Sequence, residues 1–459
     1  MNVSVTKVTQ QAMRAMSKPR GVPEVKSWAG PAKPGLALGL GLLAAGVTGV
    51  AGFAADRLSR DRRRAITLDE ELGDHFFRGD PDEEFTVTAP DGVLLHVEVD
   101  YPRVPRSRDT ASGLNGANGS NGSARANGAN GTGDTLRHDP DVPVEDHGVV
   151  KPTVILCHGY CLTKECWVFQ RRALRRAGYR VVLWDQRGHG RSGSGDPDSY
   201  HVDKLGDDLA AVIAATAPEG PIVLVGHSMG GMTLMSYALG HAEELAERVV
   251  GAAFIATSSG RLGDVEYGLG RVAGGVVHRT APGFVRMLTG VPQLVDGAVR
   301  AGRDVIDFLV DWGSFGSPVP MSVAKLTTDM ITGTDMEVVA AFMYRFDEHD
   351  KTEALARFDG RELLVFNGTK DRLTPPEHSE EIIRHLPGAE HVLVEGAGHV
   401  IMLEVPDLLN TALLELMERA SRAVADESPV ERDAVQVTRV TEAPWKLSEI
   451  RAAYEGEWR

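Results

Sequence analysis

Three residues that lie far apart in the chain have the side-chain types of a nucleophile, an acid and a base. Ser228 lies in Gly226-His-Ser-Met-Gly230, after an apolar run that ends at Val225. Asp371 and His399 each follow a later apolar run. A serine hydroxyl needs a histidine to take its proton, and the histidine needs a carboxylate to fix its tautomer. These residue types therefore suit acyl transfer through a covalent intermediate.

The two glycines around Ser228 indicate a sharp turn between a strand and a helix. Side chains two residues either side of the serine would collide at such a turn, so Gly226 and Gly230 are both needed and Gly231 adds room. Backbone strain there lifts the Ser228 hydroxyl clear of the sheet. In a chain with 51 Gly the pattern arises easily by chance, so its weight comes from the flanking strand and helix.

The stretches around these residues alternate between strand-like and helix-like patterns. A β-hairpin over 83–88 and 93–99, with a turn at 89–92, opens the folded region. The expected strands are then 153–157, 180–184, 221–225, 249–256, 362–366 and 391–395, and the expected helices 167–177, 202–215, 376–386 and 403–420. This alternation predicts an α/β fold with a doubly wound, mostly parallel sheet.

Residues 261–350 break the alternation. They hold helical spacing but no convincing strand, and they fall between two expected sheet strands. We therefore expect an inserted helical cap over the carboxyl edge of the sheet, where ligands bind in such folds. We expect the large apolar cap residues to pack mainly in the core of the cap and only secondarily to line a pocket. They are Phe284, Met287, Leu288, Phe308 and Trp312.

The basic N-terminal segment 1–64 differs in charge from the rest of the chain. It carries eleven Lys/Arg against three Asp/Glu, although the whole chain has a net charge of −15. Its apolar run 35–55 has no charged residue and is long enough to cross a bilayer. A membrane anchor and a Gly/Ala helix lying on the protein or membrane surface both fit. The arginines after the run favour a cytoplasmic catalytic domain; without an anchor, the expectation is a soluble cytoplasmic protein.

Two other stretches lack the pattern of a packed core. Residues 106–134 consist of Asn, Gly, Ser and Ala repeats and predict a flexible loop. Residues 421–459 predict a charged C-terminal tail. The folded α/β domain is therefore expected over 65–420, with the low-complexity loop and the cap inside it.

Composition excludes several classes of function. The acidic body of the chain is a poor nucleic-acid binder, so we expect no nucleic-acid partner. The only cysteines, Cys157, Cys161 and Cys166, have no second metal-like pair, which argues against a disulfide scaffold and a metal site.

Four motifs in this order resemble an α/β-hydrolase fold protein of the esterase and lipase type, over roughly residues 84 to 420. They are His158-Gly159, Asp185 to Gly193, Gly226 to Gly230, and the Asp371/His399 pair. The resemblance implies that Ser228 is the nucleophile, His399 the general base and Asp371 the orienting acid, with Asp264 as the alternative acid. It also implies an oxyanion hole from the backbone N–H groups of Met229 and Tyr160, although the His-Gly-Gly-Gly form of some lipases is missing. His158, His189 and His227 are expected to order the loops.

The implied activity is a serine hydrolase that cleaves a carboxylic ester, a thioester or a similar acyl bond. It needs neither cofactor nor metal. The apolar cap and the run 35–55 favour a small hydrophobic acyl substrate. Acyl transfer to an alcohol and cofactor-free perhydrolysis use the same residues and remain alternatives. A non-catalytic ligand-binding protein, or a membrane-tethered interaction protein with this fold, remains a third.

Deleting residues 1–64 tests the membrane anchor. We expect the shortened protein to move from the membrane fraction to the soluble fraction, because the uncharged run 35–55 is removed. Ultracentrifugation of cell lysates followed by immunoblotting measures the partition. Unchanged partitioning of the shortened protein contradicts the anchor.

Overall fold

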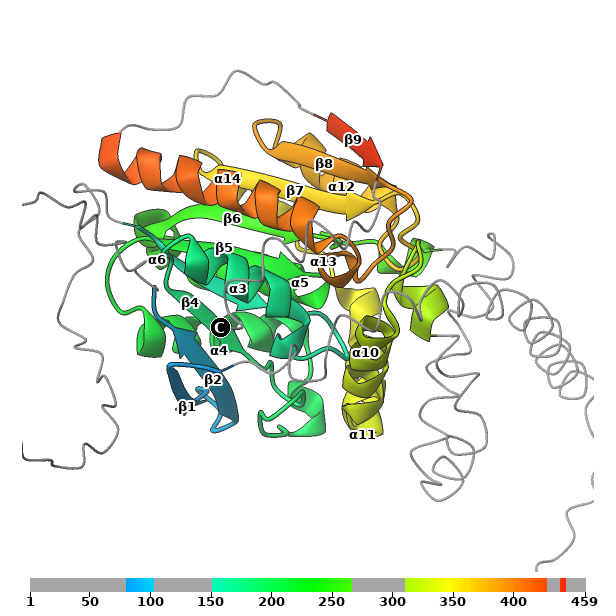
Figure 1. Cartoon of the computed structure of the whole chain (residues 1–459). Helices are drawn as coiled ribbons and strands as arrows, with labels where there is room; N and C mark the ends of the chain where they lie inside the picture. The colour runs from blue at the N-terminus through cyan, green and yellow to red at the C-terminus, as the bar shows by residue number, and fades with distance from the viewer. Residues whose placement is uncertain (1–79, 103–150, 266–309, 427–437, 443–459) are drawn as a thin grey trace, which may run out of the picture. The chain divides into compact units, whose positions relative to one another are not determined.

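The computed structural model describes residues 80–102, 151–265, 310–426 and 438–442 (Figure 1). The chain divides into two units, Met1–Arg57 and Leu58–Arg459, and all described residues lie in the second. Several predicted features lie outside the described residues: the apolar run 35–55, the loop 106–134, and the cap residues Phe284, Met287, Leu288 and Phe308. Among the helices that are described, none has the length and apolar character to span a membrane.

A nine-stranded sheet lies at the centre of the described part. Its strands, in spatial order, are β1 (Glu83–Thr88), β2 (Leu94–Asp100), β4 (Val181–Trp184), β3 (Thr153–Cys157), β5 (Ile222–His227), β6 (Val249–Ile255), β7 (Glu362–Gly368), β8 (Glu390–Glu395) and β9 (Thr438–Glu442). β1 pairs antiparallel with β2 and β2 with β4, whereas all other neighbours are parallel. The predicted doubly wound, mostly parallel sheet is confirmed.

Helices cover both faces of the sheet because its central strands are apolar on both faces. One apolar cluster joins the strands to α3 (Val168–Arg176), α13 (Ile401–Glu404) and α14 (Pro406–Asp426); a second joins them to α4 (Val202–Thr216), α5 (Met229–Gly240), α6 (Ala242–Arg248) and α12 (Pro376–His385). Along β3, Leu156 packs into the first cluster and Ile155 into the second. In Figure 1, α14 crosses the front of the sheet.

The chain between β6 and β7 contributes helices beyond the carboxyl ends of the strands (Figure 1). They are α10 (Met321–Gly333) and α11 (Met336–Arg345). Short 3-10 helices complete the described elements: η2 (Lys164–Trp167), η3 (Pro197–Ser199), η4 (Leu262–Asp264), η5 (Phe346–Glu348) and η6 (Thr352–Phe358).

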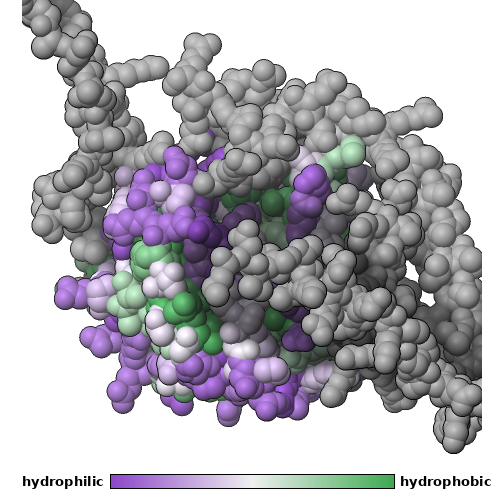
Figure 2. Space-filling view, turned by 90° about the horizontal axis from the view of Figure 1, so that it is seen from below, coloured by the Kyte–Doolittle hydropathy of each residue, from purple (hydrophilic) through white to green (hydrophobic). Residues whose placement is uncertain are grey.

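Figure 2 shows one face of the molecule, where hydrophilic residues surround a strip of hydrophobic ones.

Two elements near the C-terminus differ from the prediction. The single helix expected over 403–420 is two helices, α13 and α14, which meet at Val405 and Pro406. Proline disfavours helical backbone in the residue before it, and Val405 accordingly has φ −133° and ψ 58°. The tail expected over 421–459 contains β9, which pairs with β8 and extends the sheet. Edge pairing uses main-chain hydrogen bonds and therefore needs little apolar sequence.

The strand order reverses at β3, because β4 lies on one side of it and β5 on the other. Loops that leave a parallel sheet on either side of such a point form a crevice at its carboxyl edge. The loop after β3 holds His158, Gly159 and Tyr160, and the turn after β5 holds Ser228. The fold thus places these two segments next to each other.

A close approach of main chains fixes the turn between β5 and α5. A Cβ atom on Gly226 would lie 2.5 Å from the carbonyl carbon of Gly230. On Gly230 it would lie 2.1 Å from the Cys157 carbonyl oxygen of β3, and on Gly231 2.5 Å from Thr257 Oγ1. Both glycines flanking Ser228 are therefore required by contacts with backbone atoms, which cannot turn aside as a flexible side chain can.

Substituting Gly230 by alanine tests this packing. We expect Gly230→Ala to lower the free energy of unfolding by about 3 kcal/mol, because the added methyl group collides with the β3 backbone. The matched control is Gly240→Ala at the end of α5, where a Cβ meets no atom within 4 Å. It should leave the stability unchanged or raise it by about 0.5–1 kcal/mol. Urea unfolding followed by circular dichroism measures both, and equal stabilities would contradict the packing argument.

Candidate active site

Ser228 is held in a backbone conformation that non-glycine residues rarely adopt. Its φ is 52° and its ψ −117°, at the N-terminal cap of α5. Its N–H donates to the Ile255 carbonyl of β6 at 2.9 Å, and its carbonyl accepts from Thr257 Oγ1 at 2.6 Å and from Gly231 N at 2.9 Å. Such strain costs about 1–3 kcal/mol and persists only where surrounding contacts fix it. Here β6, the residue Thr257 after it, and Gly231 of α5 supply those contacts.

Asp371 and His399 are brought together from the ends of β7 and β8. His399 Nδ1 lies 2.9 Å from Asp371 Oδ2 and 3.1 Å from Oδ1, and both residues are buried. With the proton on Nδ1, the imidazole keeps Nε2 as its acceptor. Asp264, the alternative acid, lies in η4, whereas the carboxylate in contact with His399 is that of Asp371.

Thr374 is a part of this arrangement that the sequence did not predict. Its N–H and the N–H of Leu373 each donate to Asp371 Oδ1 at 2.9 Å, and its hydroxyl donates to Oδ2 at 2.9 Å. The same hydroxyl lies 3.3 Å from His399 Nδ1. Three donors besides the imidazole therefore fix the orientation of the carboxylate. A threonine three residues after Asp371 and directly before Pro375 is the sequence signal for this turn.

His227 connects the turn at Ser228 to the loop of His399. Its Nε2 donates to the His399 carbonyl oxygen at 2.9 Å, and the two rings are 4.9 Å apart between centroids. Burial, with the nearby His399 ring as a second cause, lowers the pKa of His227 well below its usual value. The ring therefore stays neutral at physiological pH and acts as a fixed link.

The loop after β3 runs directly beside the nucleophile turn. A Cβ on Gly159 would lie 2.6 Å from His227 Nδ1 and 3.2 Å from Ser228 Cβ, so glycine is needed for this approach. Tyr160 follows, and its hydroxyl donates to the Val339 carbonyl of α11 at 2.5 Å. Met229 is the first residue of α5, where an N–H has no partner inside the helix. The loop after β3 thus passes beside Ser228, and Tyr160 and Met229 are the chain neighbours of Gly159 and Ser228 at this approach.

The other histidines of these loops bond to main chain, as the sequence predicts. His158 Nε2 accepts from Gln186 N at 2.8 Å, and His189 Nε2 accepts from Cys161 N at 3.1 Å. Burial lowers the pKa of His158, and burial together with the neighbouring His158 lowers that of His189 to about 3. Both rings stay neutral and order the loops.

An apolar cluster covers the site from the side of the cap. It contains Tyr200, Leu205, Met229, Val338 and Phe342, with Tyr160, Ala341 and Phe346 packed against it. The Tyr160 ring meets Phe346 edge to face, with centroids 5.0 Å apart. Helix α11 therefore contacts the side chains of both Tyr160 and Met229.

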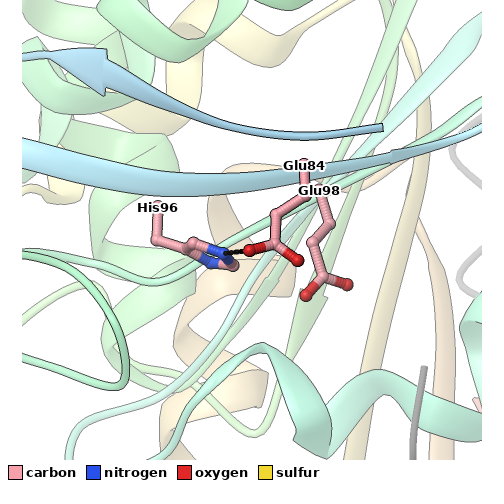
Figure 3. A group of neighbouring side chains, drawn as sticks. All are labelled: Glu84, His96 and Glu98. Atoms are coloured by element: carbon pink, nitrogen blue, oxygen red, sulfur yellow. Dashed lines mark ion pairs between the residues drawn. The ribbon is translucent and has the colours of Figure 1, made fainter. Parts of the chain in front are cut away.

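A separate group on the hairpin has the side chains of a metal site. Glu84, His96 and Glu98 place ligand atoms within 4.8 Å of one another, and Figure 3 shows them on one side of β1 and β2. Glu84 lies directly opposite Glu98, a pairing that is unfavourable without cations.

Cations already neutralise these carboxylates. Arg191 pairs with Glu84 at 2.5 Å, Arg171 with Glu98 at 2.6 Å, and Lys164 with Glu98 at 3.3 Å. A bound metal ion would have to compete with all three. The arrangement fits an ion-pair cluster that joins the hairpin to the loops after β3 and β4.

Comparison with known proteins gives the same fold. A family model described as the alpha/beta hydrolase fold matches residues 152–406. The non-heme chloroperoxidase CPO-A1 of Kitasatospora aureofaciens is 26% identical over 303 residues, which cover 62% of this chain and 98% of that protein. The proline iminopeptidase PfmaB of Pestalotiopsis fici is 24% identical over 261 residues, covering 52% and 82%.

Solved structures agree at lower identity. The esterase EaEST of Exiguobacterium antarcticum matches with a TM-score of 0.51 and 16% identity, covering 73% of this chain and 100% of that one. This likeness concerns the fold alone. The family match extends over more than half of the sequence, and the sheet and its switch point agree with it. The chain therefore belongs to the α/β-hydrolase fold family and is a hydrolase.

Proposed function

We propose that this protein is a serine hydrolase that cleaves a carboxylic ester or a similar acyl bond through an acyl-enzyme. One observation carries the proposal: Ser228 lies at a strained turn, and its neighbour His227 donates to the carbonyl of His399, which pairs with Asp371. A nucleophile, a base and an orienting carboxylate are the groups that acyl transfer requires.

The proposed reaction has two halves. In the first, Ser228 Oγ attacks the substrate carbonyl carbon while His399 Nε2 takes the hydroxyl proton. The oxyanion accepts hydrogen bonds from the N–H groups of Met229 and Tyr160, and His399 then gives its proton to the leaving alkoxide. In the second half, His399 takes a proton from water, the hydroxide attacks the acyl-enzyme, and the carboxylic acid leaves as Ser228 is reprotonated.

The apolar cluster at the cap supports a hydrophobic acyl group. Val338 and Phe342 of α11 pack with Met229, the proposed oxyanion donor beside Ser228. These side chains are buried against one another, so the surroundings of the proposed oxyanion donor are apolar.

Perhydrolysis is a second candidate, favoured by the similarity of an 86-residue stretch, at 38% identity, to a bifunctional esterase/perhydrolase of Acinetobacter calcoaceticus. In this reaction hydrogen peroxide replaces water in the second half: it attacks the acyl-enzyme, the acyl group leaves as a peracid, and Ser228 is reprotonated by His399. The same residues serve both reactions, and an assay for peracid with added peroxide distinguishes the two.

We also retain membrane association through residues 35–55 as a proposal. It rests on the sequence of that run, which lies outside the described residues, and is tested by the deletion given above.

Labelling with a serine-reactive fluorophosphonate tests the nucleophile. We expect one covalent adduct on Ser228 in the folded full-length protein, found by peptide mass spectrometry, and hydrolysis of p-nitrophenyl esters of graded chain length. Ser228→Ala should lose the adduct and lower kcat by about 10⁶-fold, because the covalent route is removed. A folded wild-type protein that forms no adduct at Ser228 would refute the proposal.

Substitution of the two candidate acids tests which one orients His399. Asp371→Asn should lower kcat by about 10⁴-fold, because an amide beside Nδ1 favours the wrong imidazole tautomer. Asp264→Asn is the matched control. Asp264 lies in η4, and the carboxylate that contacts His399 is that of Asp371, so this variant should keep kcat near the wild-type value. The reverse pattern, measured by steady-state ester hydrolysis, would assign the role to Asp264.

A further inference from the structure

A buried glutamate outside the proposed triad holds a segment of the cap against the loop of His399. Glu404 ends α13 and is fully buried. Its Oε1 accepts from Ser317 N at 2.6 Å and Ser317 Oγ at 2.5 Å, and its Oε2 accepts from Gly398 N at 2.8 Å. Gly316 N lies 3.1 Å from Oε2 and 3.2 Å from Oε1. Hydrogen bonds to a carboxylate are roughly twice as strong as neutral ones.

The two segments that Glu404 joins are in direct backbone contact. A Cβ on Gly398 would lie 2.5 Å from Gly316 N, and a Cβ on Gly316 would lie 2.3 Å from the Gly396 carbonyl oxygen. Val400 N donates to the Ser314 carbonyl at 2.8 Å. Glycine at both crossing positions lets the cap segment lie flat on the loop that carries His399.

The same cap segment is also attached to the loop of Asp371. Lys370 Nζ donates to the Gly316 carbonyl at 3.3 Å. Arg372 Nη1 donates to the Trp312 carbonyl at 2.6 Å, and its guanidinium lies 4.8 Å from the centre of the Trp312 ring. Lys370 and Arg372 are the chain neighbours of Asp371, so one segment, 312–317, contacts both loops.

We propose that Glu404 is a positioning residue: it fixes segment 312–317 across the loops of Asp371 and His399 and so sets the position of the imidazole relative to Ser228. This inference rests on the proposed function of the three residues. Glu404 touches no substrate and acts through the Gly398 N–H, next to His399. A misplacement of about 1 Å at a reacting group costs roughly 10²-fold in rate.

The chemistry of the site requires a carboxylate in particular. Donors converge on both oxygens of Glu404, and a glutamine has only one acceptor oxygen. Its NH₂ group would face either Ser317 or Gly398, so one of the two segments would lose its attachment. Burial raises the pKa of Glu404, and the hydrogen bonds from Ser317, Gly398 and Gly316 oppose that rise.

The experiment compares Glu404→Gln with a matched buried glutamate elsewhere. Glu362 on β7 is buried and pairs with Arg419 at 2.9 Å, away from the cap segment. In the full chain, Glu404→Gln should lower kcat for p-nitrophenyl esters by about 10–100-fold, with KM within about twofold of wild type, since the residue does not contact substrate. Glu362→Gln should keep kcat at the wild-type value. Rates are expressed per active site, titrated with the fluorophosphonate.

A milder variant and a second measurement keep the test decisive if Glu404→Gln folds poorly. Ser317→Ala removes one donor to Glu404 and should lower kcat by a smaller factor. Hydrogen–deuterium exchange should rise in the peptides around Gly398 and Gly316 in both variants, and not in Glu362→Gln. Wild-type kcat per active site in Glu404→Gln, or a fall that Glu362→Gln shares, overturns the positioning role. A wild-type protein without an adduct at Ser228 overturns the proposed function instead.

Discussion

The contact between the turn after β5 and the backbone of β3 is the constraint on which the site depends. Gly230 lies so close to Cys157 that no side chain fits between them, and Ser228 is forced to a positive φ. A conformation of this kind is stable only when its own N–H and carbonyl groups are satisfied from outside the turn. β6 and Thr257, which follows it, do this, so the strain at Ser228 is offset by hydrogen bonds to the neighbouring strand and its loop.

The parallel sheet explains how residues distant in the sequence meet. Asp371 and His399 follow β7 and β8, neighbours whose carboxyl ends lie at the same edge as that of β5. His399 is then fixed at two points: Asp371 accepts from its ring Nδ1, and His227 Nε2 donates to its main-chain carbonyl oxygen. Burial keeps His227 neutral, so this link does not change with pH near neutrality.

Charges away from the site stabilise the frame rather than perform chemistry. The hairpin places Glu84 opposite Glu98, and Lys164, Arg171 and Arg191 compensate their repulsion. The pairs of Glu98 with Lys164 and Arg171 are buried, and such pairs are expensive to break because one charge is then left without a partner. The cluster therefore ties the antiparallel edge to the loops that follow β3 and β4, close to the segment that carries Tyr160.

The sequence by itself determined the α/β alternation, the hairpin, the sharp turn at Ser228 and the residue types of the acid and base, because these depend on local periodicity and on glycine spacing. It did not show Thr374 or Glu404 as partners of the site, nor β9 as a strand of the sheet. Thr374 lies three residues from Asp371, but the partners of Glu404 and β9 lie far along the chain: the contact of Glu404 with Ser317 joins residues 87 apart. Only the tertiary structure brings such groups together, because packing of the cap and pairing at a sheet edge leave no local pattern in the sequence.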